Sequence, residues 1–225
     1  MPNQIIEVDG AFGSGGGQVL RTACALSTIT KKPCRVFAIR KGRSKSGLMP
    51  QHLLGIQALA GLCHGKLEGD YIGSEEIKFY PGEIKPKELF VGGGTPHMLS
   101  GVPLAIKIET AGSIALVLQS LVLAGLFSPS EIKINFEGGA TDTFFSPTID
   151  HFQHVFLKNL EKMNGKAEIN ILKRGYYPEG GAELGAIIYP SRLKNLNLVE
   201  RGNLKNILVI SGASGTLKDK KVAER

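Results

Sequence analysis

Cysteine is scarce in this sequence, and the spacing of its few cysteines excludes two classes of protein. There are three cysteines, Cys24, Cys34 and Cys63, and no Cys-x-x-Cys pair. An odd number argues against a disulfide framework, and the spacing does not fit a zinc site. Metal-ligand spacing is also missing among four of the histidines: His64, His97, His151 and His154. We therefore expect reduced core thiols in a cytoplasmic protein.

Long hydrophobic runs and an export signal are missing too. The longest apolar run, Ile114–Phe127, is shorter than a membrane span and contains Gln119 and Ser120. The start of the chain, Met1–Gly10, has no basic region followed by an apolar stretch, so nothing indicates export. We interpret the apolar run as a buried helix and expect no membrane association.

Acidic residues are absent from one long segment. Between Gly10 and Lys66 there are nine basic residues and no Asp or Glu: Arg21, Lys31, Lys32, Arg35, Arg40, Lys41, Arg43, Lys45 and Lys66. The whole chain has 27 Lys+Arg and 20 Asp+Glu, which leaves 18 basic and 20 acidic residues elsewhere. The net charge of +7 therefore belongs to this segment, and it indicates a polyanionic partner.

The chain otherwise has the composition of a globular protein, and its hydrophobic pattern repeats. The first half predicts six elements in the order strand, helix, strand, helix, strand, strand. The first strand is Gln4–Val8, and a helix follows the glycine-rich turn that ends at Gln18. The remaining strand, helix and two strands are predicted at Cys34–Ile39, Pro50–Cys63, Lys66–Tyr71 and Glu76–Tyr80. The second half predicts the same order of strands and helices, at Leu104–Ile108, Ala111–Phe127, Glu131–Phe136, Pro147–Met163, Ala167–Leu172 and Ala182–Tyr189. Ile6 corresponds to Ile106 and His52 to His151, offsets of 100 and 99 residues. A nearly constant offset indicates an internal repeat, and chance similarity of two α/β segments is the alternative.

We therefore predict an α+β fold built from α/β-type βαβαββ repeats. The first repeat is placed at residues 1–90 and the second at 91–190, with the segment Val91–Pro103 linking them. One more strand is predicted at Asn206–Ile210, and Gly215–Arg225 is polar and basic. A lone strand and a charged tail cannot bury a core, so we assign 191–225 to a linker and the beginning of another domain. Docking of this tail on the repeats is the alternative.

A glycine-rich turn, Asp9–Gln18, joins the first strand to the first helix. Glycines let backbone N–H groups approach an anion, and the helix N-terminus adds a favourable dipole. The turn is neither a Walker A loop, since no Gly-Lys-Ser/Thr follows, nor a dinucleotide fingerprint, since no acid appears before Glu68. Alternatively, it merely permits tight packing. Arg21 stands three residues after Gln18, where its guanidinium fork is suited to hold a phosphate.

A second basic cluster runs from Arg40 to His52. It leaves a strand, crosses a loop that contains Arg43 and enters a helix at Pro50, so Gln51 and His52 lie where free N–H groups favour an anion. Because the two clusters lie at equivalent ends of adjacent units, we expect them to form one site for a phosphate-bearing ligand. A solvated basic loop is the alternative. We interpret His52 as a phosphate contact because no carboxylate lies near it in the sequence.

Two further residues are candidate ligand contacts. Gln119 is a lone amide in an apolar helix, so it needs a specific hydrogen-bond partner, either a ligand or a backbone group. Pro147 and the neighbouring phenylalanines are suited to form a flat apolar wall for a base, or else to cap the helix that follows.

Taken together, the motifs resemble those of the RNA 3′-terminal phosphate cyclases. The resemblance runs the length of the chain, and its ordered combination is specific. It rests on Asp9-Gly10, Gly15–Arg21, Ile39-Arg40, Arg43, Gly47-Leu48, Gln51–Leu53, Thr110–Ser113, Leu116–Gln119, Gly138-Gly139, Arg174–Gly181 and Val222–Arg225.

The resemblance implies repeats similar to those of enolpyruvyl transferases, with a smaller domain inserted after the second repeat. It implies a ligase reaction in which ATP, with Mg²⁺ or Mn²⁺, adenylates an enzyme histidine. AMP then passes to an RNA 3′-phosphate, and the neighbouring 2′-hydroxyl attacks to leave a 2′,3′-cyclic phosphate. The expected partners are RNA 3′ ends and ATP, together with further copies of the chain or a second chain that supplies a missing third repeat.

The resemblance also implies roles for individual residues. The phosphate end of the site is assigned to Arg21, Arg40, Arg43, Gln51 and His52, and the nucleotide to Gln119 and Pro147. No catalytic residue is assigned, because the adenylated histidine is expected beyond Arg225, with the third repeat. The family usually has Glu where this chain has Ser14, so the metal ligands are unknown.

Three functions remain open on these grounds. The first is an ATP-dependent cyclase, or the N-terminal part of one. The second is a non-catalytic relative that binds RNA in RNA processing or ribosome assembly, which Ser14 and the missing histidine favour. The third is an enolpyruvyl-transferase-like enzyme for small phosphorylated substrates.

Overall fold

The computed structural model describes residues 4–85 and 104–224 of the chain. The linker that we predict at Val91–Pro103, the domain boundary near residue 90 and His97 lie outside the described residues. The domain boundaries therefore stay predictions.

The first repeat forms a four-stranded sheet with strand order β1-β2-β4-β3. β1 and β2 are parallel, and the other pairs are antiparallel. The strands are β1 (Ile6–Asp9), β2 (Cys34–Phe37), β3 (Lys66–Glu68) and β4 (Ile77–Tyr80). Helix α1 (Gly17–Thr30) connects β1 to β2, and helix α2 (Pro50–Cys63) follows β2.

The second repeat has the same topology. Its sheet has the order β5-β6-β8-β7, again with one parallel pair followed by antiparallel pairs. The strands are β5 (Leu104–Ser113), β6 (Ile132–Ala140), β7 (Lys166–Lys173) and β8 (Glu183–Tyr189), and helix α3 (Ile114–Gly125) connects β5 to β6. Two sheets of equal strand order confirm the α+β fold with repeated βαβαββ units.

The helix that we expected at Pro147–Met163 is one helical segment of three parts. These are α4 (Ile149–His151), a π-helical turn (Phe152–Phe156) and α5 (Leu157–Lys162). The segment begins after Thr148, whose Oγ1 accepts the backbone N–H of His151 at 3.1 Å. This N-cap satisfies a free N–H of the first turn and so favours the start of the helix there.

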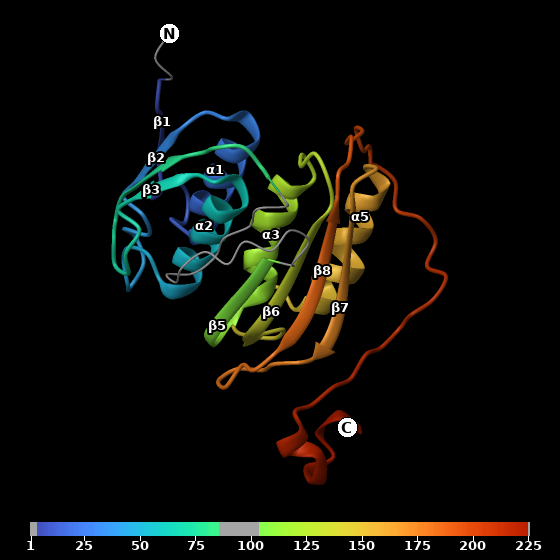
Figure 1. The fold of residues 1–225 in the computed structure, drawn as a ribbon. Helices are drawn as coiled ribbons and strands as arrows, with labels where there is room; N and C mark the ends of the chain where they lie inside the picture. Colours follow the sequence, from blue (N-terminus) through green and yellow to red (C-terminus); the bar gives the residue numbers. More distant parts are fainter. Residues whose placement is uncertain (1–3, 86–103, 225) are drawn as a thin grey trace.

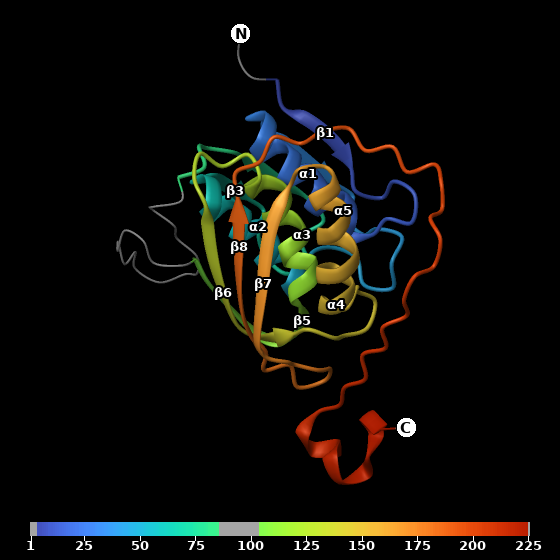
Figure 2. The same ribbon diagram turned by 90° about the vertical axis from the view of Figure 1, so that its right-hand side faces the viewer.

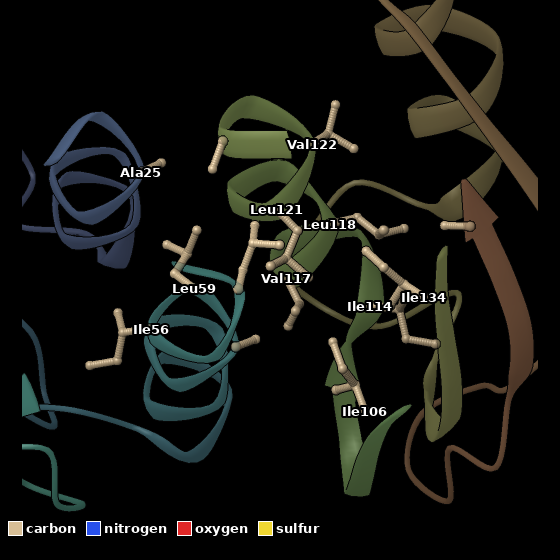
Figure 3. Packing of buried hydrophobic residues seen from close by; sticks show 14 of the residues in the cluster. Ala25, Ile56, Leu59, Ile106, Ile114, Val117, Leu118, Leu121, Val122 and Ile134 are labelled. Carbon is tan, nitrogen blue, oxygen red and sulfur yellow. The ribbon is translucent and has the colours of Figure 1, made fainter. Parts of the chain in front are cut away.

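Helices α1, α2 and α3 pack together between the two sheets (Figure 1). In Figure 3, Leu59 of α2 faces the cluster that contains Val117 and Leu121 of α3. Helix α3 is apolar on nearly all sides because it meets helices α1 and α2 on one side and strands β6 and β8 on the other (Figure 3). The apolar run is thus a buried helix, and no described helix is long and apolar enough to span a membrane.

The buried face of α1 differs by about one residue from the periodicity in the sequence. Helical spacing in the sequence places Val19, Ala23 and Leu26 on one apolar face, with Leu20, Cys24 and Ser27 beside them. In the structure Leu20, Cys24 and Ser27 are buried, whereas Leu26 is 47% exposed. Two adjacent faces of α1 have similar composition, and the contacts of α1 with α2 and α3 determine which of them is buried. All three cysteines are buried and unpaired, as expected.

The strand that we expected at Asn206–Ile210 is wrong. Residues 190–214 run without strand pairing along and away from the body (Figure 2), and Ile207, Leu208 and Val209 are about 80% exposed. Their β propensity is not realised because no described strand lies beside them to accept their hydrogen bonds. Two short 3-10 turns follow, at Gly215–Lys220 and Val222–Glu224.

Candidate phosphate-binding site

Three helix N-termini meet at one end of the molecule. Helices α1, α2 and α3 begin after the carboxyl ends of β1, β2 and β5. The first turn of α2 contacts both other helices: a Cβ atom on Gly17 would overlap Nε2 of His52, and the backbone N–H of Ser113 donates to Oε1 of Gln51 at 3.4 Å. None of the three first turns contains an acid. Free N–H groups and three helix dipoles therefore favour an anion here.

Arg21 is a buried cation at this place. It is 6% exposed, and Nη2 donates to Oε1 of Gln18 at 2.8 Å. Its Nε has no hydrogen-bond partner, and no ion pair with a carboxylate is found for it in the described part of the chain. Burial lowers the pKa of Arg21 to about 10, so the side chain stays charged at neutral pH. A buried guanidinium with an unpaired N–H is stabilised by an anion that completes its hydrogen bonds.

Two more arginines come from the loop between β2 and α2. Nη2 of Arg43 donates to Oγ of Ser14 at 3.2 Å, which places the guanidinium against the glycine turn before α1. Arg40 adopts φ 56°, and its carbonyl accepts the backbone N–H of Arg43 at 2.9 Å. Burial, followed by the charge of Arg43, lowers the pKa of Arg40. Two like charges are thus held near one another, an arrangement that a bound anion would stabilise.

His52 is held in its neutral form. The side chain is 5% exposed, and Nδ1 accepts the backbone N–H of Met49 at 3.2 Å. Burial, with the charges of Arg40 and then Arg21, lowers the pKa of His52 to about 4. Because Nδ1 is an acceptor, the ring proton is on Nε2, the atom that faces Gly17. His52 therefore presents a hydrogen-bond donor at the N-terminus of α1, as suits a phosphate contact.

This burial predicts a pH dependence of stability. The pKa of His52 falls from 6.5 in the unfolded chain to about 4 in the folded protein. Between these values the unfolded chain binds the extra proton, so the free energy of unfolding decreases as the pH falls. We expect a loss of about 2 kcal/mol between pH 8 and pH 5 from this group. Urea unfolding at both pH values should show a smaller loss in His52→Gln, and equal losses in the two proteins would contradict a buried neutral His52.

The two residues that we associate with a nucleotide come from the second repeat. Gln119 is in the middle of α3, and its Oε1 is buried without a hydrogen-bond partner. Pro147 is half-buried in the loop 141–148 after β6. No hydrogen bond among residues 4–85 and 104–224 joins Gln119 to Arg21, Arg43 or His52. The structure thus brings together the five residues assigned to phosphate, but the roles of all seven stay predictions.

Two contributors were not found from the sequence. Ser113 is the N-cap of α3: its Oγ accepts the N–H of Leu116 at 3.3 Å, and its own N–H binds Gln51. A serine directly before an apolar helix is a recognised capping signal, so this residue was accessible to sequence reasoning. Gly17 admits the His52 ring beside α1. That requirement is visible only in the structure.

The described residues offer hydrogen-bond donors suited to a phosphate and no cluster of three acidic, histidine or cysteine side chains suited to a divalent metal. In the ranges 4–85 and 104–224, no three His, Cys, Asp or Glu side chains are grouped so as to hold an ion. The hydroxyl of Ser14 accepts from the guanidinium of Arg43, whose charge repels a cation. Mg²⁺ and Mn²⁺ prefer several carboxylate and other oxygen ligands. The carboxylate of the glycine turn, that of Asp9, accepts the backbone N–H of Ala11 at 2.9 Å.

Comparison with known proteins gives a consistent result along most of the chain. The profile of a family described as RNA 3′-terminal phosphate cyclase matches residues 12–216. Among similar proteins, an RNA 3′-terminal phosphate cyclase of Methanosarcina acetivorans is 42% identical over 193 residues, 86% of this chain and 50% of the relative. That of Thermococcus kodakarensis is 44% identical over 185 residues, 82% of this chain and 49% of the relative.

The matches cover most of this chain but a smaller share of each relative. The protein of the same description from Ignicoccus hospitalis is 40% identical over 223 residues, 98% of this chain and 58% of the relative. The chain therefore spans about half the length of the curated relatives that it matches.

Proposed function

The chain belongs to the RNA 3′-terminal phosphate cyclase family, and on that premise we propose that it forms the phosphate-binding part of an ATP-dependent RNA 3′-phosphate cyclase. The observation that carries this proposal is Arg21, which is buried with an unpaired N–H where three helix N-termini meet and which pairs with no carboxylate of the described residues. A terminal phosphate supplies the negative charge and the acceptor oxygens that this place needs.

The chemistry of cyclisation explains why such a site is useful. Transfer of AMP from ATP to the RNA 3′-phosphate brings two anions together and converts a poor leaving group into a good one. Arg21, Arg43 and the three helix N-termini would neutralise these phosphates and orient them. The 2′-hydroxyl then attacks the activated phosphorus, and AMP leaves as the 2′,3′-cyclic phosphate forms. None of the described histidines is assigned to carry AMP.

His52 would bind in this scheme rather than attack. Its imidazole is neutral, and Nδ1 is occupied by the backbone N–H of Met49, so the free ring atom carries a proton. A protonated Nε2 donates a hydrogen bond and has no lone pair for a nucleophilic step.

A non-catalytic RNA-binding factor is the second candidate, and the Ser14–Arg43 hydrogen bond favours it. The two candidates separate when the protein is incubated with ATP labelled at the α-phosphate and an RNA carrying a 3′-phosphate. Covalent AMP together with a cyclic RNA end supports the cyclase. RNA binding with neither product supports the non-catalytic factor, and absent or salt-insensitive RNA binding contradicts both.

Substitution Ser14→Glu tests the missing metal ligand. A carboxylate in the glycine turn offers the hard oxygen that Mg²⁺ prefers, so we expect the Mg²⁺-dependent part of ATP binding to rise several-fold. Isothermal titration with ATP, with Mg²⁺ and with EDTA, measures it. Ser44→Glu, an exposed position in the neighbouring loop, controls for the added charge. Equal ATP affinity of Ser14→Glu and the parent protein in the presence of Mg²⁺ would contradict the expectation that a carboxylate at position 14 binds the metal.

We also propose the two-repeat division at 1–90 and 91–190, with 191–225 leading into a further domain. The equal strand order of the two sheets supports it. RNA 3′ ends and ATP are the proposed partners. The three buried, unpaired thiols support a reducing, cytoplasmic location.

A further inference from the structure

Three aromatic side chains gather on the surface at two loops of the second repeat. Phe144, Phe145 and Tyr177 are 70%, 104% and 57% exposed. The ring centroids of Phe144 and Tyr177 are 5.0 Å apart in an edge-on arrangement, and those of Phe144 and Phe145 are 6.3 Å apart. We call these residues the aromatic cluster. Exposed aromatic side chains that group in this way mark an interaction surface.

The two loops below the aromatic cluster are tied together. The backbone N–H of Tyr177 donates to the carbonyl of Asp142 at 3.2 Å, and Thr141 Oγ1 donates to the carbonyl of Gly175 at 2.9 Å. Arg174 binds both carboxylate oxygens of Asp150, at 2.6 and 2.8 Å. This network positions the aromatic cluster before any ligand arrives, which reduces the entropy cost of binding.

The hairpin that carries Tyr177 packs against the segment that leads to the phosphate-binding site. The hairpin that carries Tyr177 lies at the end of the sheet where β6 finishes, because Glu137 of β6 pairs with Glu183 of β8. A Cβ atom on Gly180 of this hairpin would lie 3.2 Å from Cα of Ala111. Ala111 is two residues before Ser113, whose N–H binds Gln51 of the site. One stretch of backbone thus connects the aromatic cluster to the helix N-termini.

We propose that the aromatic cluster is a stacking surface for the unpaired bases of single-stranded RNA next to its 3′-terminal phosphate. This inference rests on the proposed function. Bases fit better than phosphates, because residues 141–149 contain no Lys or Arg and the guanidinium of Arg174 is already paired. Aromatic rings offer π faces on which any base stacks, so the surface would hold an RNA end without reading its sequence.

A fluorescent RNA tests this proposal on the full chain. The probe is a ten-nucleotide single strand with a 3′-phosphate and 2-aminopurine as the penultimate base. We expect binding to quench the 2-aminopurine by stacking. Phe145→Ala and Phe145→Leu should remove the quenching and weaken RNA binding about ten-fold, whereas Phe145→Tyr keeps both. Phe127→Ala, an exposed phenylalanine just after α3, is the matched control and should change neither.

The outcomes separate this inference from the proposed function. Weaker RNA binding in Phe145→Ala with unchanged affinity for inorganic phosphate supports the stacking surface. RNA binding that persists undiminished in Phe145→Ala and Phe145→Leu overturns the stacking surface and leaves the proposed function intact. No RNA binding by the parent protein overturns both. A dimer that dissociates in Phe145→Ala, with RNA affinity unchanged, would assign the surface to a second copy and overturn the proposal.

Discussion

Arg21→Ala is expected to weaken binding of a 3′-phosphorylated RNA about 100-fold, the loss typical of one partner of a buried charge pair. The folded protein should persist, because within residues 4–85 and 104–224 the side chain of Arg21 is hydrogen-bonded to Gln18 of the same helix and to no other element. Arg21→Lys should recover part of the loss, since an ammonium keeps the charge without the bidentate fork. Filter binding at fixed salt, with circular dichroism as the folding check, measures both.

The control for this prediction is Arg35→Ala. Arg35 lies in the same acid-free segment, so its loss changes the net charge equally. Its guanidinium is already paired with Glu7 and Glu76 on the sheet, at 2.7 Å from each carboxylate. RNA binding should be nearly unchanged in this variant. A cooperative loss of structure in Arg21→Ala would instead identify Arg21 as a structural arginine and contradict its assignment to phosphate.

Gly17→Ala is expected to disrupt the site by adding a methyl group to the backbone of α1 where His52 packs. The new methyl group would overlap Nε2 of His52, so the imidazole must leave its position beside α1. Overpacking of this kind costs about 1–3 kcal/mol of stability, and displacement of the ring should reduce RNA-end binding about ten-fold or more. Gly42→Ala is the control, because its Cβ atom would meet nothing within 4 Å.

A double variant identifies the cause. Combining Gly17→Ala with His52→Ala removes the overlap. The double variant should therefore lose less stability than the sum of the losses in the two single variants, while its RNA-end binding stays weak. Chemical unfolding of the four proteins gives the coupling free energy. Additive losses would show that Gly17 and His52 do not contact one another.

Most of the fold could be predicted because its signals are local. Helix α2 begins at Pro50 and ends at Cys63 as predicted, since a proline is favoured in a first helical turn and the apolar spacing continues to the cysteine. Asn206–Ile210 shows the limit of such reasoning. Its β-branched residues favour a strand, but a strand also needs a neighbour, which the sequence of the segment does not reveal.

The candidate site could be predicted in its composition but not in its electrostatics. The glycine turn and the absence of acids pointed to Arg21 and Arg43, both of which now lie near the N-terminus of α1. The neutral state of His52 depends on burial and on the charges of Arg40 and Arg21, and the second of these lies on a different helix. The network below the aromatic cluster depends on Arg174 and Asp150, which are 24 residues apart. Contacts of this range leave no mark in sequence spacing.

The most direct test compares two RNAs that differ only at the 3′ end, one with a phosphate and one with a hydroxyl. We predict that the phosphorylated RNA binds at least about ten-fold more tightly at 0.15 M salt, and that Arg21→Ala removes this difference. Equal affinities for the two RNAs in the parent protein would show that the basic segment attracts the RNA chain in general, and would contradict a site for its terminal phosphate.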